Sequence, residues 1–270
     1  MRVLDLFAGC GGMSLGFENA GFEVVAAYDF WDPAIDVYRT NLPHPIFKQD
    51  LSDVAASLRA MRKYKPDMVI GGPPCQDFSH AGKRSEGHRA NLTVAFAEIV
   101  TSLSPEWFVM ENVDRALGSS AFRDAKGLFW KKGYGLTTVV LDASVCGVPQ
   151  RRKRLFCIGK RGEEEGFLSE LIEQRLAREP MTVRDYFGDE LSTEYYYRHP
   201  RNYARRAIYS IDEPAATVRG VNRPIPAGYK KHPGDPVSPK KARTLTTDER
   251  AMVQTFPRGF KWLGSKDCKN

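Results

Sequence analysis

The chain has 270 residues, 42% of them hydrophobic, which is enough for one large α/β domain or for a large domain with a small one. No stretch comes near the ~20 apolar residues of a membrane-spanning helix, and a strand-like run follows Met1 directly, so we expect neither a membrane span nor a signal peptide. Five cysteines without C-x-x-C spacing and scattered histidines predict no disulfide framework and no metal, and they indicate a reducing cytosol.

The net charge of +7 is distributed unevenly along the chain. Residues 1–149 contain 15 Lys/Arg and 17 Asp/Glu, whereas residues 150–270 contain 25 and 16, a net charge of +9. This asymmetry predicts a polyanion-binding face in the second half, attached to a nearly neutral body. The alternative is a basic surface that is merely solvated. Aromatic residues interleaved with arginine, as in Tyr195-Tyr196-Tyr197-Arg198, favour the polyanion-binding interpretation.

Apolar runs alternate with stretches of helical period over the first 160 residues. We expect strands at 2–7, 24–28, 68–70, 107–110, 136–141 and 155–158, and helices at 13–20, 33–41, 53–63, 92–103 and 120–132. This alternation predicts an α/β fold of βαβ units, with a mostly parallel sheet covered on both faces. No helix-length spacer separates the last two runs, which predicts an antiparallel hairpin at one edge.

The pattern decays after residue 159, and the chain becomes rich in Pro, Arg, Tyr and turn residues. We expect a domain change near residue 161. The expected division is a first domain at 1–161, a smaller irregular domain at 162–242, and a segment at 243–270 that returns toward the first domain. Two further helices are expected, at 163–178 and 248–254.

A glycine-rich loop, Asp5-Leu6-Phe7-Ala8-Gly9-Cys10-Gly11-Gly12, follows the first expected strand. Glycines at such a junction let a ligand approach the backbone and the positive end of the next helix. The loop lacks the Gly-Lys-Ser/Thr of a Walker motif. A G-x-G-x-x-G fingerprint read from Gly9 meets Ser14 where its third glycine should stand. The loop therefore predicts a nucleoside-type ligand without a pyrophosphate.

Acidic residues stand where the next strands end. Asp29 ends the second strand about twenty residues on, where an acid typically accepts hydrogen bonds from a ribose diol. Phe30 follows and could lie against a purine, and Asp50 occupies the same kind of place after the next segment. Each Asp alone could equally be a helix cap. Together with the loop, they favour a nucleoside.

A cysteine stands at the end of the strand expected at 68–70, in the run Gly71-Gly72-Pro73-Pro74-Cys75-Gln76. Proline fixes φ and cannot donate a backbone hydrogen bond, so Cys75 lies where the chain leaves the sheet. Open α/β folds place their chemistry at this edge. We interpret Cys75 as a positioned nucleophile; the alternative is a small buried hydrophobic residue.

A carboxylate and a basic run complete the candidate chemistry. Glu111 closes the strand expected at 107–110, where burial should raise its pKa and suit it to share a proton with a substrate nitrogen. On an extended strand, Arg152 and Arg154 of Gln150-Arg151-Arg152-Lys153-Arg154 share one face. Beside Cys75 they would favour the thiolate and hold an oxyanion or carbonyl. The alternative is an ordinary basic surface.

In combination these motifs closely resemble the DNA (cytosine-5) methyltransferase family of the bacterial restriction–modification type. The resemblance spans residues 2 to about 264 and rests on D-L-F-A-G-C-G-G, G-G-P-P-C-Q, E-N-V, Q-R-R-K-R, R-T-L-T at 243–246 with Glu249, and Q-T-F-P at 254–257. It implies a Rossmann-like S-adenosylmethionine-dependent methyltransferase sheet, a smaller irregular target-recognition domain, duplex DNA between them and a place in the bacterial cytosol.

The resemblance also implies roles for individual residues. Cys75 would attack C6 of a cytosine flipped out of the duplex, Glu111 would engage N3 and the exocyclic amine, and Arg154 would hold O2, with Arg152 nearby. The loop 79–89, with Gly82 and Gly87, would close over DNA, and DNA contacts are expected from Gln76, Ser79 and Arg89. The S-adenosylmethionine pocket is expected to comprise Phe7, Gly9, Gly11, Asp29, Phe30, Asp50, Pro74 and Leu92.

The family normally continues after the Phe-Pro segment into a Gly-Asn-containing stretch and a final helix. This chain ends at Asn270, where that stretch should begin. We therefore expect either that the chain is incomplete or that another polypeptide completes the cofactor pocket.

Three other functions are compatible with parts of the pattern. They are an RNA cytosine methyltransferase on the same scaffold, a non-catalytic DNA-binding homologue or subunit, and a small-molecule methyltransferase. The basic recognition segment disfavours the first and the last, and the intact Cys75, Glu111 and Arg154 disfavour the second.

Overall fold

The structure is a computed structural model that describes residues 1–74, 92–200, 202, 204–220 and 222–263. Its contacts divide the chain into two compact units, each described by itself below. Unit 1 comprises Met1–Val140 and Arg154–Gln174, and unit 2 comprises Leu141–Lys153 and Arg175–Asn270. Packing thus groups the chain differently from the three segments expected from the sequence, and the functional division at 161 and 242 stays a prediction.

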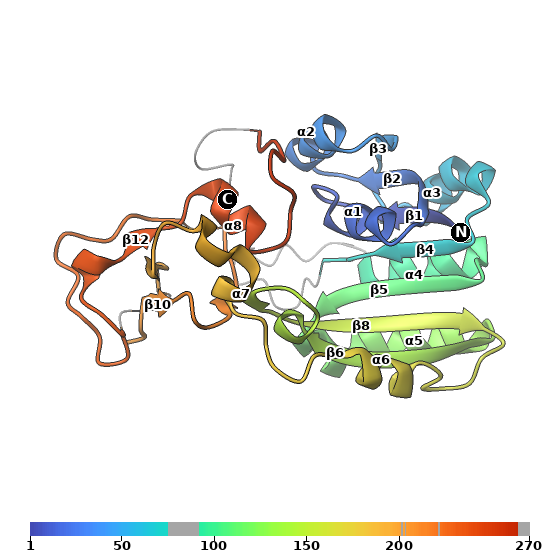
Figure 1. Cartoon of the computed structure of the whole chain (residues 1–270). Coiled ribbons are helices and arrows are strands. Elements are labelled where there is room, and N and C mark those ends of the chain that lie inside the picture. The colour runs from blue at the N-terminus through green and yellow to red at the C-terminus, as the bar shows by residue number, and fades with distance from the viewer. Residues whose placement is uncertain (75–91, 201, 203, 221, 264–270) are drawn as a thin grey trace. The chain divides into compact units, whose positions relative to one another are not determined.

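Unit 1 is built on a seven-stranded sheet of order β3-β2-β1-β4-β5-β8-β6 (Figure 1). The first five strands pair in parallel, and β8 runs antiparallel to β5. This is the doubly wound, Rossmann-like sheet that the sequence predicts. The strands are β1 (Arg2–Leu6), β2 (Glu23–Asp29), β3 (Ile46–Lys48), β4 (Met68–Gly71), β5 (Trp107–Val113), β6 (Tyr134–Asp142) and β8 (Lys153–Arg161).

Helices cover both faces of this sheet. Alternate residues of each buried strand point to opposite faces, so Phe108 packs with Phe96 of α4 and Phe129 of α5, while Trp107 packs on the face that α1 covers. The helices of unit 1 are α1 (Gly12–Asn19), α2 (Asp32–Asn41), α3 (Val54–Met61), α4 (Leu92–Leu103), α5 (Ser120–Lys131) and α6 (Ser169–Arg175, which crosses the boundary into unit 2).

Two features of the sheet differ from the expectation. β3 was not expected, because it has only three residues and Phe47 and Lys48 are exposed. β5 continues three residues beyond Met110, because β8 continues the ladder as far as the pair Val113 and Arg154. The expected pairing at the edge is present, since β8 lies next to β6, but β8 is inserted between β6 and β5.

The strand order places the topological switch point between β1 and β4. From β1 the chain proceeds outward to β2 and β3, then returns to β4 on the other side. In open α/β sheets, ligands bind beyond the carboxyl ends of the strands at such a point. Here the glycine-rich loop after β1 and the Gly-Gly-Pro-Pro loop after β4 flank that point.

Unit 2 has little regular structure. β9 (Tyr195–Tyr197) pairs antiparallel with β10 (Ile208–Ser210) and parallel with β12 (Arg243–Thr244), and β7 (Gln150–Arg151) pairs in parallel with β11 (Ala215–Ala216). Its helices are α7 (Val183–Phe187) and α8 (Thr247–Met252), each opened by a capping box. Short 3-10 helices occur in both units at Arg62–Tyr64, Asp114–Gly118, Ala143–Val145, Gly188–Glu190 and Pro239–Lys241.

The loop before β12 is held in place by hydrogen bonds to a buried carboxylate, Asp235. Asp235 accepts backbone hydrogen bonds from Ala207 at 2.9 Å, Ile208 at 3.0 Å and His232 at 2.8 Å, and a fourth from the Tyr229 hydroxyl at 2.7 Å. Burial alone would raise the pKa of Asp235, but these donors together lower it. The ionised side chain therefore pins this loop to the start of β10.

Candidate active site

The glycine-rich loop has the open backbone that a ligand requires. Phe7 and Gly9 have φ of +57° and Gly11 has φ of +94°. A Cβ at Gly9 would meet no atom within 4 Å, whereas a Cβ at Gly11 would overlap Leu42 and lie 2.9 Å from Tyr38 Cδ2. Gly11 is thus required by packing, and Gly9 faces open space. A non-glycine residue in the left-handed region, such as Phe7, is strained and typical of functional loops.

Asp29 joins the loop after β1 to the loop after β2. Its Oδ2 accepts the backbone N–H of Gly9 at 2.8 Å, and its Oδ1 accepts that of Trp31 at 2.8 Å. Each carboxylate oxygen can accept a further hydrogen bond, which is what a ribose diol needs. The structure thus brings together two of the residues that the sequence assigns to the cofactor.

The remaining cofactor candidates lie at the same edge of the sheet or beside it. Phe30 is 63% exposed, and Lys48 Nζ lies 5.6 Å from its ring centre, so the ring is available to a purine. Asp50 is exposed, and its Oδ1 accepts hydrogen bonds from Ser52 N and Oγ. Pro74 is exposed, and Leu92, which begins α4, is half-buried. An acceptor carboxylate, an open glycine and an exposed aromatic ring fit S-adenosylmethionine.

A buried polar chain lies beneath the loop, and sequence reasoning missed it. Ser14 Oγ donates to Asp5 Oδ2 at 2.6 Å, and the Tyr38 hydroxyl donates to Ser14 Oγ at 2.9 Å. Burial raises the pKa of Asp5 to about 7. The signal was present at Ser14, which stands where a dinucleotide fingerprint has its third glycine. Its hydroxyl ties α1 to β1 under the loop.

The ion pair between Glu111 and Arg154 is the second half of the site. Arg154 Nε lies 2.8 Å from Glu111 Oε1. The Glu111 side chain is 26% exposed and the Arg154 side chain is 21% exposed. A Cβ placed on Gly72 would lie 3.1 Å from Glu111 Oε2, so the carboxylate lies against the loop that leads to Cys75. Contrary to the expectation, Glu111 lies within β5 and not beyond its end, because the ladder with β8 continues past it.

Asn112, the residue after Glu111, fixes the same loop from the other side. Its Nδ2 donates to the carbonyl oxygen of Pro73 at 3.0 Å, and its Oδ1 accepts the backbone N–H of Val113 at 2.8 Å. Asn112 is 4% exposed. A buried amide that satisfies a proline carbonyl holds the loop in one position relative to Glu111. In the sequence, Asn112 stands out only as part of the E-N-V motif.

Several expected residues are not placed in this site. Cys75, Gln76, Ser79 and Arg89, with the expected loop 79–89, lie outside the described residues. Arg152 belongs to unit 2 and donates its backbone N–H to Asp142 Oδ1 at 3.1 Å. Arg152 lies between two strands, because β7 ends at Arg151 and β8 begins at Lys153, and the shared face expected for Arg152 and Arg154 stays a prediction.

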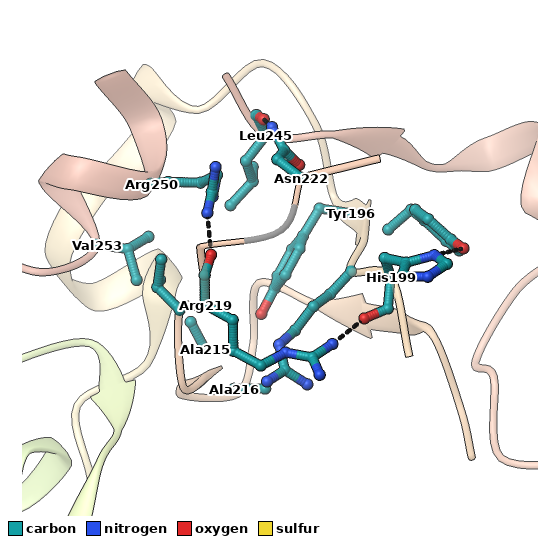
Figure 2. Close-up of a pocket in the computed structure, with 12 residues that line it drawn as sticks. Tyr196, His199, Ala215, Ala216, Arg219, Asn222, Leu245, Arg250 and Val253 are labelled. Atoms are coloured by element: carbon teal, nitrogen blue, oxygen red, sulfur yellow. Dashed lines mark hydrogen bonds between the residues drawn. The ribbon is translucent and has the colours of Figure 1, made fainter. Parts of the chain in front are cut away.

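Unit 2 contains a pocket whose lining is held together by arginine side chains (Figure 2). Arg250 donates to the carbonyl oxygen of Arg219, Arg219 donates to that of His199, and Arg198 Nη2 donates to that of Thr217 at 2.7 Å. No acidic side chain is among its described lining residues. In a unit with few strands, these guanidinium groups satisfy backbone carbonyl oxygens that a sheet would otherwise satisfy.

The described part of the chain contains neither a membrane-spanning helix nor a metal cluster. No helix there is long and apolar enough to cross a membrane. The same residues contain no cluster of three or more His, Cys, Asp or Glu side chains that could hold a metal ion.

Comparison with known proteins decides the family. The family model for C-5 cytosine-specific DNA methylase matches residues 1–269. The chain belongs to this family. The predicted family and enzyme class, a DNA cytosine-5 methyltransferase, are thereby confirmed.

The relatives of this DNA methylase agree along nearly its whole length. It is 56% identical over 267 residues to the Type II methyltransferase M.HgiDI of Herpetosiphon aurantiacus, covering 98% of this chain and 86% of that protein. It is 53% identical over 269 residues to the Type II methyltransferase M.HindV of Haemophilus influenzae, covering 98% and 88%. The Dnmt2 methyltransferase structure of S. pombe aligns with a TM-score of 0.71 over 100% of this chain and 91% of that one; at 16% identity this concerns the fold alone.

Proposed function

We propose that the protein transfers a methyl group from S-adenosylmethionine to C5 of a cytosine flipped out of a short specific site in duplex DNA. The transfer proceeds through a covalent adduct between Cys75 and C6 of the base. The relatives named Type II methyltransferases support a role in a restriction–modification system, which acts in the bacterial cytosol.

The cofactor is assigned to the carboxyl ends of β1, β2 and β4. When bound, S-adenosylmethionine supplies an electrophilic methyl group. Asp29 would accept hydrogen bonds from the ribose hydroxyls, and Phe30 would cover the adenine ring. Asp50 would accept a hydrogen bond from the adenine amino group. The open side of Gly9 admits the methionine end, with Phe7, Gly11, Pro74 and Leu92 shaping the wall. The hydrogen bond between Asp29 and Gly9 N supports this assignment, since it keeps the ribose acceptor and the open loop together.

The chain's own residues activate the base. The thiolate of Cys75 forms a bond to C6, and the negative charge that develops in the ring at C5 makes that carbon nucleophilic. Glu111 holds a proton at N3 and contacts the exocyclic amine, while Arg154 holds O2 with Arg152 nearby. Attack of C5 on the methyl group would break the bond between the methyl carbon and the sulfonium sulfur and leave the thioether. Loss of the C5 proton and breakage of the bond between the Cys75 sulfur and C6 then restore the ring and the thiolate. Extrusion of the base is required because C6 is not accessible within the stack.

The Glu111–Arg154 pair beside Gly72 carries the proposal. A carboxyl group 2.8 Å from a guanidinium presents a partner for N3 and the exocyclic amine beside a cation for O2. Gly72 precedes Cys75 by only three residues, so the pair and the thiol can address one ring. Removal of either charge should therefore lower the rate of methyl transfer more than the affinity for the cofactor.

Transfer of a tritiated methyl group tests the function. Purified protein is incubated with labelled S-adenosylmethionine and either duplex DNA or transfer RNA, and the nucleosides are separated after digestion. We expect label in 5-methyldeoxycytidine. Label in RNA alone would assign the activity to the RNA alternative.

Binding of duplex DNA without any transfer would favour the non-catalytic alternative. That result requires one further assay, because the match covers 86% of the length of M.HgiDI. The assay is repeated with the part of M.HgiDI outside this match fused to the chain. Continued inactivity of the fusion would refute the proposed catalysis.

A further inference from the structure

A basic groove in unit 2 lies outside the candidate active site. Its volume is about 280 Å³, and it is lined by Arg151, Arg198, Arg206, Tyr209, Glu213, Pro214, Ala216 and Thr217. Three guanidinium groups thus face one carboxylate among the described lining residues. The groove shares Arg198 and Ala216 with the arginine-built pocket in Figure 2.

The floor of the groove is built from paired backbone. β11 pairs with β7 so that Ala216 lies opposite Arg151. The Thr217 hydroxyl donates to the carbonyl oxygen of Arg151 at 2.7 Å, and Arg198 Nη2 donates to the carbonyl oxygen of Thr217 at 2.7 Å. Arg151 itself is exposed at the end of β7. The backbone of Arg151 and the guanidinium group of Arg198 are therefore held by fixed elements before any ligand arrives.

An aromatic and ionic cluster forms another part of the lining. Arg206 lies over the ring of Tyr209 at 4.3 Å from its centre and pairs with Glu213 at 2.5 Å. The ring of Tyr209 stacks on that of Tyr196, with centres 5.7 Å apart. Glu213 already accepts from Arg206 and from Ser210 N, so its charge is largely used within this cluster. The groove retains an excess of positive charge.

Arg198, which lines the groove, has one donor without an acceptor among the described residues. Arg198 Nε is buried and has no hydrogen-bond partner among the described residues. A buried donor without an acceptor costs about 1–3 kcal/mol unless water or a ligand satisfies it. An acceptor-only anion satisfies several guanidinium donors at once, and the planar fork of arginine matches phosphate oxygens in particular.

We infer that this groove binds a backbone phosphate of the substrate DNA, with Arg151 as its exposed phosphate contact. The inference rests on the proposed function for its partner. It adds residues to the DNA contacts expected at Gln76, Ser79 and Arg89, and it assigns them a positioning role. Phosphate contacts fix register on the duplex and carry no sequence information directly. Arg151 precedes Arg154 by three residues, so this contact ties the register of the duplex to the segment that carries the site.

Salt dependence of DNA binding tests the groove separately from catalysis. Affinity for two duplexes of unrelated sequence is measured over a range of salt concentrations for the wild type, Arg151→Gln and Arg151→Lys. Each lost phosphate contact flattens the slope of log K against log salt by about 0.9. We expect this flattening in Arg151→Gln on both duplexes alike, and a wild-type slope in Arg151→Lys.

Lys240→Gln is the matched control, because Lys240 is an exposed cation of unit 2 that does not line the groove. Its slope should remain that of the wild type, and the thermal unfolding midpoint should be the same for all variants. A wild-type slope in Arg151→Gln, equal flattening in Lys240→Gln, or loss confined to one duplex would each overturn the inference. Methyl transfer by the same wild-type preparation is measured in parallel, so that failure of the proposed function is recognised separately.

Discussion

Asn112 donates a hydrogen bond from its side-chain amide to the carbonyl oxygen of Pro73 at 3.0 Å, in a buried part of the molecule. The bond joins two parallel strand ends, because Asn112 follows Glu111 in β5 and Pro73 follows β4. The positions of the carboxylate and of the loop that leads to Cys75 are therefore coupled. We regard Asn112 as a positioning residue that acts through Glu111 and this loop.

Asn112→Ala is expected to lower kcat about 10-fold or more while leaving the KM for S-adenosylmethionine within about 3-fold, since a misplaced catalytic group is penalised mainly in the transition state. The buried Pro73 carbonyl loses its donor, which should lower the free energy of unfolding by about 1–3 kcal/mol. Asn41→Ala is the control, because it removes a comparable hydrogen bond from a side-chain amide to the carbonyl oxygen of Val37, within α2 and outside β4 and β5. Equal losses of kcat in both variants would show that Asn112 acts only through stability.

Glu111→Gln keeps the shape of the side chain and an acceptor for Arg154 but removes the acid. We expect kcat to fall about 100-fold or more, the range of general acid–base contributions. Cofactor affinity should change little, because Asp29 and the loop at Gly9 lie at other strand ends. Steady-state kinetics and calorimetric titration with S-adenosylmethionine separate the two effects. Parallel losses in both would indicate misfolding and refute the assigned role.

Gly9→Ala is expected to weaken S-adenosylmethionine binding at least 10-fold, because the new methyl group enters the open space assigned to the cofactor. The positive φ adds a strain of about 1–2 kcal/mol. Gly21→Ala is the matched control: Gly21 has φ of +85° and the same open surroundings, but it lies in the turn after α1. Both variants should lose similar stability, and only Gly9→Ala should lose affinity. Similar affinities would contradict the placement of the ligand.

Asp5 should make stability depend on pH. Its pKa is raised to about 7 in the folded state by burial, from 3.8. Between these values the folded protein keeps a proton that the unfolded chain releases, so the contribution is full below pH 3.8 and is lost as pH rises through 7. Thermal unfolding midpoints at pH 5 and pH 8 should differ less in Asp5→Asn than in the wild type. Equal differences would refute the buried, protonated carboxyl; Asp124→Asn, an exposed acid on α5, serves as control.

The sheet of unit 1 could be predicted from the sequence because its strands are apolar runs and its loops carry glycine, proline or acid at strand ends. Where a strand is short or its partner decides its length, the sequence alone is insufficient. Ile46–Lys48 is a strand only because it completes the edge beside β2. Glu111 belongs to β5 only because β8 continues the ladder, which no local pattern reveals.

The contacts within the site were less predictable than its residues. Asp29 and Gly9, or Glu111 and Arg154, were assigned to a common site, but the hydrogen bonds that pair them depend on register between strands far apart in the chain. The excess of positive charge in the second half of the chain is evident from the sequence. The sequence does not reveal that Arg219 and Arg250 bind backbone carbonyls while Arg151 is exposed. That distinction depends on how an irregular unit satisfies its own backbone.

Capture of the covalent adduct is the most direct test of the central claim, methyl transfer through Cys75. A duplex with 5-fluorodeoxycytidine in place of deoxycytidine has no C5 proton to lose after transfer, so the thiol cannot be released. With S-adenosylmethionine, the wild type is expected to form a complex that survives denaturing electrophoresis, and peptide mass spectrometry should place the DNA on Cys75. Cys75→Ser should form none. Methyl transfer to ordinary duplex DNA without such a complex, or linkage to another cysteine such as Cys146, would contradict the mechanism.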